Sequence, residues 1–363
     1  MKDIICFTAS LASGGAEHQM LILADFLKKK GYNVKLVVCF DYPDHYTLPD
    51  SLNVERLNVK GNRIQKEWTI IKYFIKCKAD TIISFREQIN FMVLIPMLFR
   101  KKINVIVGER NLTIGRPSFY GWLDLNLLYR RANYIVTNSH SQEEFIRNYT
   151  KRYNDKICTI INYTEFNKYQ YHYHVESNSL VIGVFCRYSK QKNYERFAKA
   201  IKLVKDRCDK AFQVHWYGAR FSQGREKEDY IMFSSIIDEL NISDVLILHD
   251  AARNVHEILG NMDAICQPSI FEGFSNSLSE GICCGKVALA GDVSDNSAMV
   301  KHGINGFLFD PYSVEDMANK IQDYLELGCI RRKEMCMKSR EVAVSLFNSD
   351  LFVNSYIKLI ESK

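Results

Sequence analysis

Short apolar runs alternate along this chain with longer segments in which apolar residues recur at helical spacing. Residues 2–8 and 34–40 are two such runs, and residues 16–30 between them fit one face of a helix that stops at Gly31. This alternation is typical of parallel α/β sheets. It predicts strands at residues 2–8, 34–40, 81–85, 105–108, 134–138 and 157–162, and then at 180–186, 212–217, 245–248, 264–267, 287–290 and 307–309.

Residues 167–174 interrupt the pattern with a polar and aromatic stretch that follows neither period. We expect a linker there, between a first domain of residues 1–170 and a second domain of residues 175–346. The chain has 363 residues, more than one hydrophobic core usually supports, which agrees with two domains. Residues 347–360 are amphipathic and predict a last helix within the segment 347–363.

The composition is that of a soluble globular protein, with 47% hydrophobic and 25% charged residues. The first apolar run is too short for a signal peptide, and residues 89–99, the longest apolar stretch, fall short of the roughly 20 residues that span a bilayer. The eleven cysteines form no Cys-x-x-Cys motif and lie mostly in predicted strands or helices. We therefore expect reduced core thiols and a cytoplasmic protein.

Positive charge is concentrated in the first half of the chain. Residues 1–170 contain 25 Lys and Arg against 16 Asp and Glu, a net charge of +9, whereas the remainder carries −3. Each basic cluster alone is typical of a solvated helix face, but together they fit an anionic membrane surface or a phosphate-bearing acceptor. Nucleic acid is not expected, since no recognised binding module accompanies the charge. The clusters are residues 28–30, 100–102, 116–122, 129–131 and 151–153.

Two carboxylates, Glu272 and Glu280, lie where a predicted strand turns into a helix. Gly273 bends the chain, and Asn276 or Ser277 can cap the helix, so that Glu280 lies about one turn inside it. The N–H groups of residues 274–277 (Phe274, Ser275, Asn276, Ser277) would then point out of the helix N-terminus and could bind a phosphate. Carboxylates accept hydrogen bonds from hydroxyls, so the pair fits a phosphate flanked by sugar or ribose. The alternative is a helix N-terminus with an incidental acidic pair.

Two further loops could contact such a ligand. Gly14 and Gly15 follow the first strand and let the backbone approach a ligand closely, although a plain tight turn is the alternative. Arg187 and Lys192, five residues apart, follow the first strand of the second domain and can converge on a diphosphate. A lone basic loop is usually solvated, but ligands of α/β proteins bind at this end of the strands.

Glu109 and Arg110 end another predicted strand of the first domain. They could contact a sugar or an acceptor, or they could pair with each other and orient loops. Both interpretations are left open by the residues alone.

From Asp263 to Asp310 the chain resembles the donor-binding signature of the retaining family 4 glycosyltransferases. The shared motifs are the two glutamates, residues 284–288 (CGKVA) and residues 303–311 (GINGFLFDP). Gly281 stands where Ala is usual, and Val287-Ala288 replaces a pair that contains Pro. The resemblance implies an α/β protein of the GT-B fold, in which two Rossmann-like domains with parallel sheets face each other across a cleft, and the C-terminal helix completes the first domain.

The resemblance also implies roles for single residues. Glu272 would hold the hydroxyls of the donor sugar and Glu280 those of the ribose, while Arg187 and Lys192 match the pair that binds the diphosphate. The loop of residues 14–17 resembles one that faces the donor phosphate and sugar.

The implied activity is that of a retaining glycosyltransferase that uses a nucleotide-diphosphate sugar. The Glu-Arg-Asn string at residues 109–111 resembles a subgroup that acts on polyprenyl-linked oligosaccharides, from which we expect a UDP-linked hexose or N-acetylhexosamine, a glycan or polyprenyl-linked acceptor, and peripheral association with the inner face of the cell membrane. No Asp-x-Asp lies at a strand end, so we expect catalysis without a metal or another cofactor. The alternatives are a nucleotide-sugar epimerase of the same fold and a noncatalytic nucleotide-sugar-binding protein.

Overall fold

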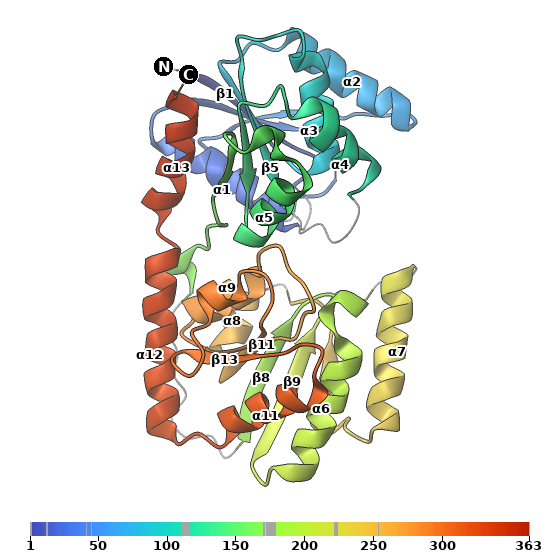
Figure 1. The fold of residues 1–363 in the computed structure, drawn as a ribbon, viewed down its shortest axis with the longest axis vertical. Helices are drawn as coiled ribbons and strands as arrows, with labels where there is room; N and C mark the ends of the chain where they lie inside the picture. Colours follow the sequence, from blue (N-terminus) through green and yellow to red (C-terminus); the bar gives the residue numbers. More distant parts are fainter. Residues whose placement is uncertain are drawn as a thin grey trace. The chain divides into compact units, whose positions relative to one another are not determined.

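The computed structural model describes residues 2–11, 14–40, 42–44, 46–110, 117–169, 171, 179–220, 224–252 and 254–362. The chain divides into two compact units, one of Met1–Tyr163 with Ser349–Lys363 and one of Thr164–Asn348 (Figure 1). The division precedes the expected linker at residues 167–174, of which Gln170 and residues 172–174 lie outside the described residues.

The first unit contains a seven-stranded parallel sheet in the order β3-β2-β1-β4-β5-β6-β7. All of its strands except β3 overlap strands predicted from the sequence; β3 is short and only half-buried, so its hydrophobic signal is weak. The strands are β1 (Asp3–Thr8), β2 (Asn33–Val38), β3 (Asn53–Arg56), β4 (Thr81–Phe85), β5 (Asn104–Glu109), β6 (Tyr134–Thr137) and β7 (Ile157–Thr159).

Alternate residues of these strands contribute to two cores, one on each face of the sheet. Ile5 and Phe7 pack with α2 and α3, whereas Ile4 and Cys6 pack with α1 and the C-terminal helix α13. The helices are α1 (Gly15–Lys29), α2 (Arg63–Lys76), α3 (Glu87–Met97), α4 (Phe119–Leu123), the π-helical turn η1 (Asp124–Leu128), α5 (His140–Tyr149), the 3-10 turn η2 (Lys151–Tyr153) and α13 (Ser349–Glu361).

The second unit contains a six-stranded parallel sheet in the order β10-β9-β8-β11-β12-β13. Each of its strands overlaps a predicted one, because all are rich in apolar or aromatic residues. They are β8 (Ser179–Phe185), β9 (Ala211–Tyr217), β10 (Leu246–His249), β11 (Ala264–Gln267), β12 (Val287–Gly291) and β13 (Gly306–Phe309).

Helices cover this second sheet as well. Residues of α6, α7 and α11 share a core with the strands, while α9 packs on β11 and β12 and is covered by α12 (Figure 1). None of the described helices combines the length and the apolar character that crossing a membrane requires. The elements are η3 (Phe166–Lys168), η4 (Lys190–Lys192), α6 (Tyr194–Arg207), α7 (Arg225–Glu239), α8 (Val255–Gly260), α9 (Asn276–Cys283), α10 (Asn296–Met299), α11 (Val314–Leu325) and α12 (Cys329–Leu346).

A buried acid lies in the π-helical turn of the first unit. Asp124 is fully buried, and neither of its carboxylate oxygens has a hydrogen-bond partner among the described residues. Burial raises the pKa of Asp124 well above its ordinary value, and the negative charges of Glu109 and Glu87 raise it further. Folding therefore favours the neutral form of this carboxyl group.

Asp124→Asn should stabilise the protein at pH 7 by about 1–3 kcal/mol, because the wild-type carboxylate must lose its hydration or take up a proton on folding. Since the pKa is raised in the folded state, the contribution of Asp124 to stability becomes less favourable as pH rises above the unfolded pKa of about 4, and the advantage of the variant shrinks toward pH 4. Urea denaturation at both pH values measures the difference, with the exposed Asp209→Asn as control. An advantage that is absent at pH 7, or equally large at pH 4, would contradict this account.

Candidate functional site

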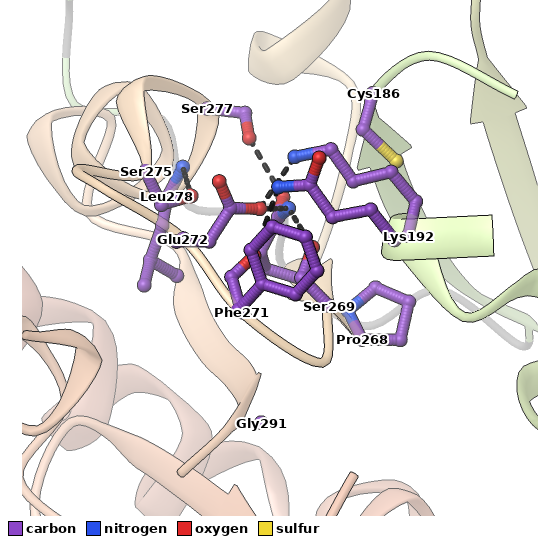
Figure 2. A network of polar contacts seen from close by, with 12 residues as sticks. Cys186, Lys192, Pro268, Ser269, Phe271, Glu272, Ser275, Ser277, Leu278 and Gly291 are labelled. Atoms are coloured by element: carbon purple, nitrogen blue, oxygen red, sulfur yellow. Dashed lines mark hydrogen bonds and ion pairs between the residues drawn. The ribbon is translucent and has the colours of Figure 1, made fainter. Parts of the chain in front are cut away.

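A buried ion pair joins two loops of the second unit (Figure 2). Lys192 ends the turn η4 after β8, and Glu272 lies in the loop after β11. Lys192 Nζ donates a hydrogen bond to Glu272 Oε1, and the two side chains are only 12% and 9% exposed, so the pair is largely desolvated. The loops meet because β8 and β11 are neighbours in a parallel sheet, whose strands end at the same edge.

Gln267, the last residue of β11, fixes the orientation of this pair. Its Nε2 donates to Glu272 Oε1 at 2.8 Å and to Ser269 Oγ at 2.7 Å, and its Oε1 accepts from Ser277 Oγ at 2.8 Å. The side chain is fully buried, so these bonds replace the water that its amide loses. The sequence interpretation missed Gln267; the available signal was a polar residue that ends an apolar strand directly before Pro268.

Two residues with positive φ support the same loop. Asn193 has φ 62° and its Nδ2 donates to the carbonyl oxygens of Pro268 at 3.1 Å and Pro311 at 2.7 Å. Ser294 has φ 52°, donates to the carbonyl oxygen of Glu272 at 2.5 Å and accepts from its N–H at 3.2 Å. Such backbone conformations cost free energy outside glycine and persist where the surroundings hold them. The loop that carries Glu272 is thus fixed from both sides.

Helix α9 begins beside the ion pair. Ser275 is its N-cap, since Ser275 Oγ accepts from Leu278 N–H at 3.4 Å. The predicted caps, Asn276 and Ser277, were wrong by one and two residues, because both already lie in the helix and the Ser277 hydroxyl bonds to Gln267. That bond places the first turn of α9, with its partial positive charge, next to the network.

The residues just before α9 belong to the same loop. Gly273 precedes Phe274, whose buried ring packs edge-on against Phe347 with centroids 6.2 Å apart. The ring therefore holds the loop against the C-cap residue of α12.

Glu280 lies one turn inside α9, as predicted, but in different surroundings from Glu272. Burial raises its pKa to about 7, an effect that a hydrogen bond with the Tyr169 hydroxyl partly offsets. Arg340 Nη1 donates to the carbonyl oxygen of Tyr169 at 2.6 Å and so anchors that residue. Glu272 is thus neutralised by a cation, whereas Glu280 titrates close to neutral pH.

Arg187 lies apart from this network. Its side chain is 61% exposed, and its Nη1 pairs with Glu226 Oε1 at 3.2 Å. The structure therefore brings together Lys192, Glu272 and Ser277, while the convergence of Arg187 with Lys192 is not seen. An exposed pair of this kind contributes at most about 1 kcal/mol, so a diphosphate could compete for the guanidinium.

In the first unit, Gly14 and Gly15 form the start of α1 after β1. A Cβ atom on Gly14 would lie 2.2 Å from Glu17 Oε2, so this position requires glycine unless the acid moves. Glu17 is itself buried, and its Oε1 pairs with Arg86 Nη1 at 2.8 Å. The preceding residue, Ser13, lies outside the described residues.

Glu109 and Arg110 are both buried, with 5% and 6% exposure. Glu109 accepts a hydrogen bond from the Tyr129 hydroxyl, and Arg110 Nη1 donates to Asn162 Oδ1 at 3.1 Å. The Arg110 guanidinium also lies 3.7 Å from the centroid of the Phe85 ring. Among the described residues the two side chains bond to other partners and form no ion pair with each other. These contacts fit a role in orienting loops, and contact with a sugar or an acceptor stays a prediction.

Comparison with known proteins places this site in context. Residues 170–342 match the family model described as glycosyl transferases group 1. Over 312 residues the chain is 23% identical to the N-acetylgalactosamine-N,N'-diacetylbacillosaminyl-diphospho-undecaprenol 4-alpha-N-acetylgalactosaminyltransferase of Campylobacter jejuni, and the match covers 80% of this chain and 81% of that protein. It is also 21% identical to the poly(ribitol-phosphate) alpha-N-acetylglucosaminyltransferase of Staphylococcus aureus, over 57% of this chain and 40% of that protein.

Solved structures share the fold along the entire chain. A sucrose-phosphate synthase from Thermosynechococcus elongatus superposes with a TM-score of 0.82 at 15% identity, covering 100% of this chain and 99% of that one. Anabaena Alr3699/HepE, in complex with UDP and glucose, has a TM-score of 0.80 at 16% identity, with 100% of both chains covered. At such identities the likeness shows the fold alone.

Removal of one partner of the buried ion pair should be costly. Lys192→Met should lower the free energy of unfolding by about 3–5 kcal/mol, since it leaves the Glu272 carboxylate buried without a cation. The double variant Lys192→Met/Glu272→Gln should recover most of that loss, and urea denaturation of the four proteins of this cycle measures the coupling. Lys202→Met, which removes an exposed pair with Asp206, is the matched control and should change little. If the two substitutions change the free energy of unfolding additively, the described pairing is contradicted.

Proposed function

We propose a donor and an acceptor for this chain, which is a glycosyltransferase with the GT-B fold, as its sequence predicted. The donor is a UDP-linked hexose or N-acetylhexosamine. The acceptor is a saccharide carried on a polyprenyl diphosphate or a growing phosphate-bearing glycan. The transfer retains the anomeric configuration, and the protein acts at the cytoplasmic face of a membrane.

The observation that carries the donor proposal is the buried cation beside the N-terminus of α9. Cleavage of the sugar–phosphate bond leaves a nucleoside diphosphate with new negative charge. Lys192 and the first turn of α9 are fixed before the reaction, so they can stabilise that charge with little reorganisation. A bound diphosphate competes with Glu272 for Lys192, which frees the Glu272 carboxylate to accept hydrogen bonds from the sugar hydroxyls.

The same arrangement supports assignments for the remaining donor contacts. Glu280 accepts hydrogen bonds from the ribose, and exposed Arg187 turns from Glu226 to the diphosphate. Within the described ranges, no group of three or more His, Cys, Asp or Glu side chains is arranged to hold a metal ion. We propose, separately, that these cations and the helix stabilise the leaving group without a metal, so that activity should survive dialysis against EDTA.

The acceptor proposal is supported by the relatives and by charge. The name of the Campylobacter relative specifies a diphospho-undecaprenol, and that of the Staphylococcus relative specifies poly(ribitol-phosphate). Both names specify a phosphate-bearing molecule, and the first 170 residues of this chain have a net charge of +9, which complements such an acceptor. The Anabaena protein forms a complex with UDP and glucose, which supports a UDP-sugar as donor.

Incubation with a panel of UDP-, GDP- and ADP-sugars, with and without polyprenyl-diphosphate saccharides, tests the proposal. We expect slow hydrolysis of a UDP-sugar alone and an α-linked product with a lipid-linked acceptor. The double variant Lys192→Met/Glu272→Gln, in which no buried charge is left unpaired, should lose about 100-fold or more in turnover.

Epimerised sugar would instead indicate an epimerase, and binding without turnover would indicate a noncatalytic protein. Preferential use of a GDP-sugar would contradict the UDP assignment.

Donor binding should depend on pH through Glu280. Because the pKa of this group is about 7 in the free protein and the carboxylate is the form that accepts from the ribose, affinity should rise about fivefold to tenfold between pH 6 and pH 8. Calorimetry with an intact nucleotide sugar avoids the terminal phosphate of UDP, which titrates near pH 6. Glu280→Gln should make the affinity independent of pH in this range, whereas the exposed Glu228→Gln should not. A pH dependence that persists in Glu280→Gln would show that another group is responsible.

A further inference from the structure

Helix α2 carries an exposed apolar stripe in addition to the face that it buries. Ile64, Trp68 and Ile75 are 77%, 53% and 49% exposed, and their spacing places them along one side of the helix. The same helix turns Ile70 and Phe74 into the core. Single exposed apolar residues are common, but a stripe of three that includes Trp marks an interaction surface.

The stripe is flanked by positive charge. The sequence of α2 has four basic residues and one acid. Lys72 and Lys76 are exposed, and Lys72 Nζ lies 5.4 Å from the centroid of the Trp68 ring. The acid, Glu67, accepts a hydrogen bond from Arg63 Nε at 3.1 Å, which neutralises it locally.

Helix α4 extends this surface. Tyr120 connects the two helices, because its hydroxyl accepts from Arg63 Nε at 3.0 Å and its ring centroid lies 5.1 Å from that guanidinium. On α4, Phe119 and Trp122 are 69% and 47% exposed. We call Ile64, Trp68, Lys72, Ile75, Lys76, Phe119 and Trp122 the α2 face; Figure 1 shows α2, α3 and α4 grouped in the first unit.

More exposed groups lie near the other end of α2. Arg100 Nη1 donates to the carbonyl oxygen of Phe74 at 2.8 Å, so the segment that follows α3 lies at the end of α2. In this segment Phe99 is 87% exposed, and Lys101 and Lys102 are exposed as well. Arg131, from another basic cluster, instead bonds to backbone carbonyls of residues 97, 100 and 103 and is structural.

We infer that the α2 face docks on an anionic membrane surface; the inference rests on the proposed function, in which the protein acts at the cytoplasmic face of a membrane. Aromatic and aliphatic side chains enter the boundary between headgroups and acyl chains, while the flanking lysines meet anionic headgroups. A second copy of this chain is a poorer occupant, since a two-fold contact would set the same lysines against each other.

The tryptophans provide a direct readout. The chain has three, of which Trp68 and Trp122 lie on the α2 face and Trp216 is fully buried in the second unit. With vesicles of phosphatidylglycerol and phosphatidylcholine at low salt, we expect a blue shift of fluorescence and quenching by lipids brominated on their acyl chains. Vesicles of phosphatidylcholine alone should give a much weaker response. Trp68→Phe should remove a large part of the quenching.

Variants separate the apolar from the electrostatic contribution. Ile64→Ser/Trp68→Ser/Ile75→Ser should lower vesicle affinity at least tenfold, whereas Ile231→Ser/Met232→Ser, at residues 52% and 53% exposed on α7, should bind as the parent does. Lys72→Glu/Lys76→Glu should lower vesicle affinity roughly fivefold for each cation removed. This difference from the parent should disappear at high salt, because salt screens the charges. The exposed Lys199→Glu/Lys210→Glu in the second unit is the matched control.

The outcomes distinguish docking from the proposed function. The stripe variant is Ile64→Ser/Trp68→Ser/Ile75→Ser. If it loses vesicle binding while its donor hydrolysis is unchanged, docking by this face is supported. Docking is overturned if the parent ignores anionic vesicles at low salt, or if the stripe variant binds them as tightly as the parent. Docking is also overturned if the stripe only mediates self-association in sedimentation. Failure to glycosylate any polyprenyl-diphosphate acceptor, with vesicle binding intact, would instead overturn the polyprenyl-diphosphate acceptor and leave the phosphate-bearing glycan.

Discussion

The buried pair of Lys192 and Glu272 is the interaction on which the proposed donor site depends. Neither charge could be held there alone, because an unpaired ion in a desolvated place costs several kcal/mol. Because the two charges pair, the fold can hold the Lys192 ammonium at the edge of the sheet before a diphosphate binds. Gln267 fixes the carboxylate from the other side, so little movement is needed when a ligand replaces one of the partners.

The parallel sheet explains why these groups meet at all. Strands β8 and β11 are neighbours, so the loops that carry Lys192 and Glu272 leave the sheet at the same edge. The bond between Ser277 and Gln267 then brings the N-terminus of α9 to that point. In the first unit, Glu17 and Arg86 form an ion pair in a similar place, between the start of α1 and the residue after β4, although the Arg86 side chain is 49% exposed. Polar groups thus gather at strand ends in both units, whereas the strands themselves form the cores.

Much of this arrangement could be predicted from the sequence. The features that could not be predicted were missed for physical reasons. Strands such as β11 and β12 were predicted because burial on both faces requires continuous apolar runs. The half-buried edge strand β3 lacks such a run. The cap of α9 was misplaced because three consecutive polar residues compete for it, and only the tertiary bond of Ser277 to Gln267 decides between them. The exposed position of Arg187 depends on Glu226, which is distant in sequence and leaves no local signal.

A crystal structure of the protein with uridine diphosphate would test the central claim most directly. In that complex we expect a phosphate oxygen within hydrogen-bond distance of Lys192 Nζ and beside the first turn of α9, with the ribose hydroxyls on Glu280. The Lys192–Glu272 bond should be lengthened or broken in that complex. A diphosphate bound elsewhere on the second unit, with the ion pair unchanged, would contradict the account.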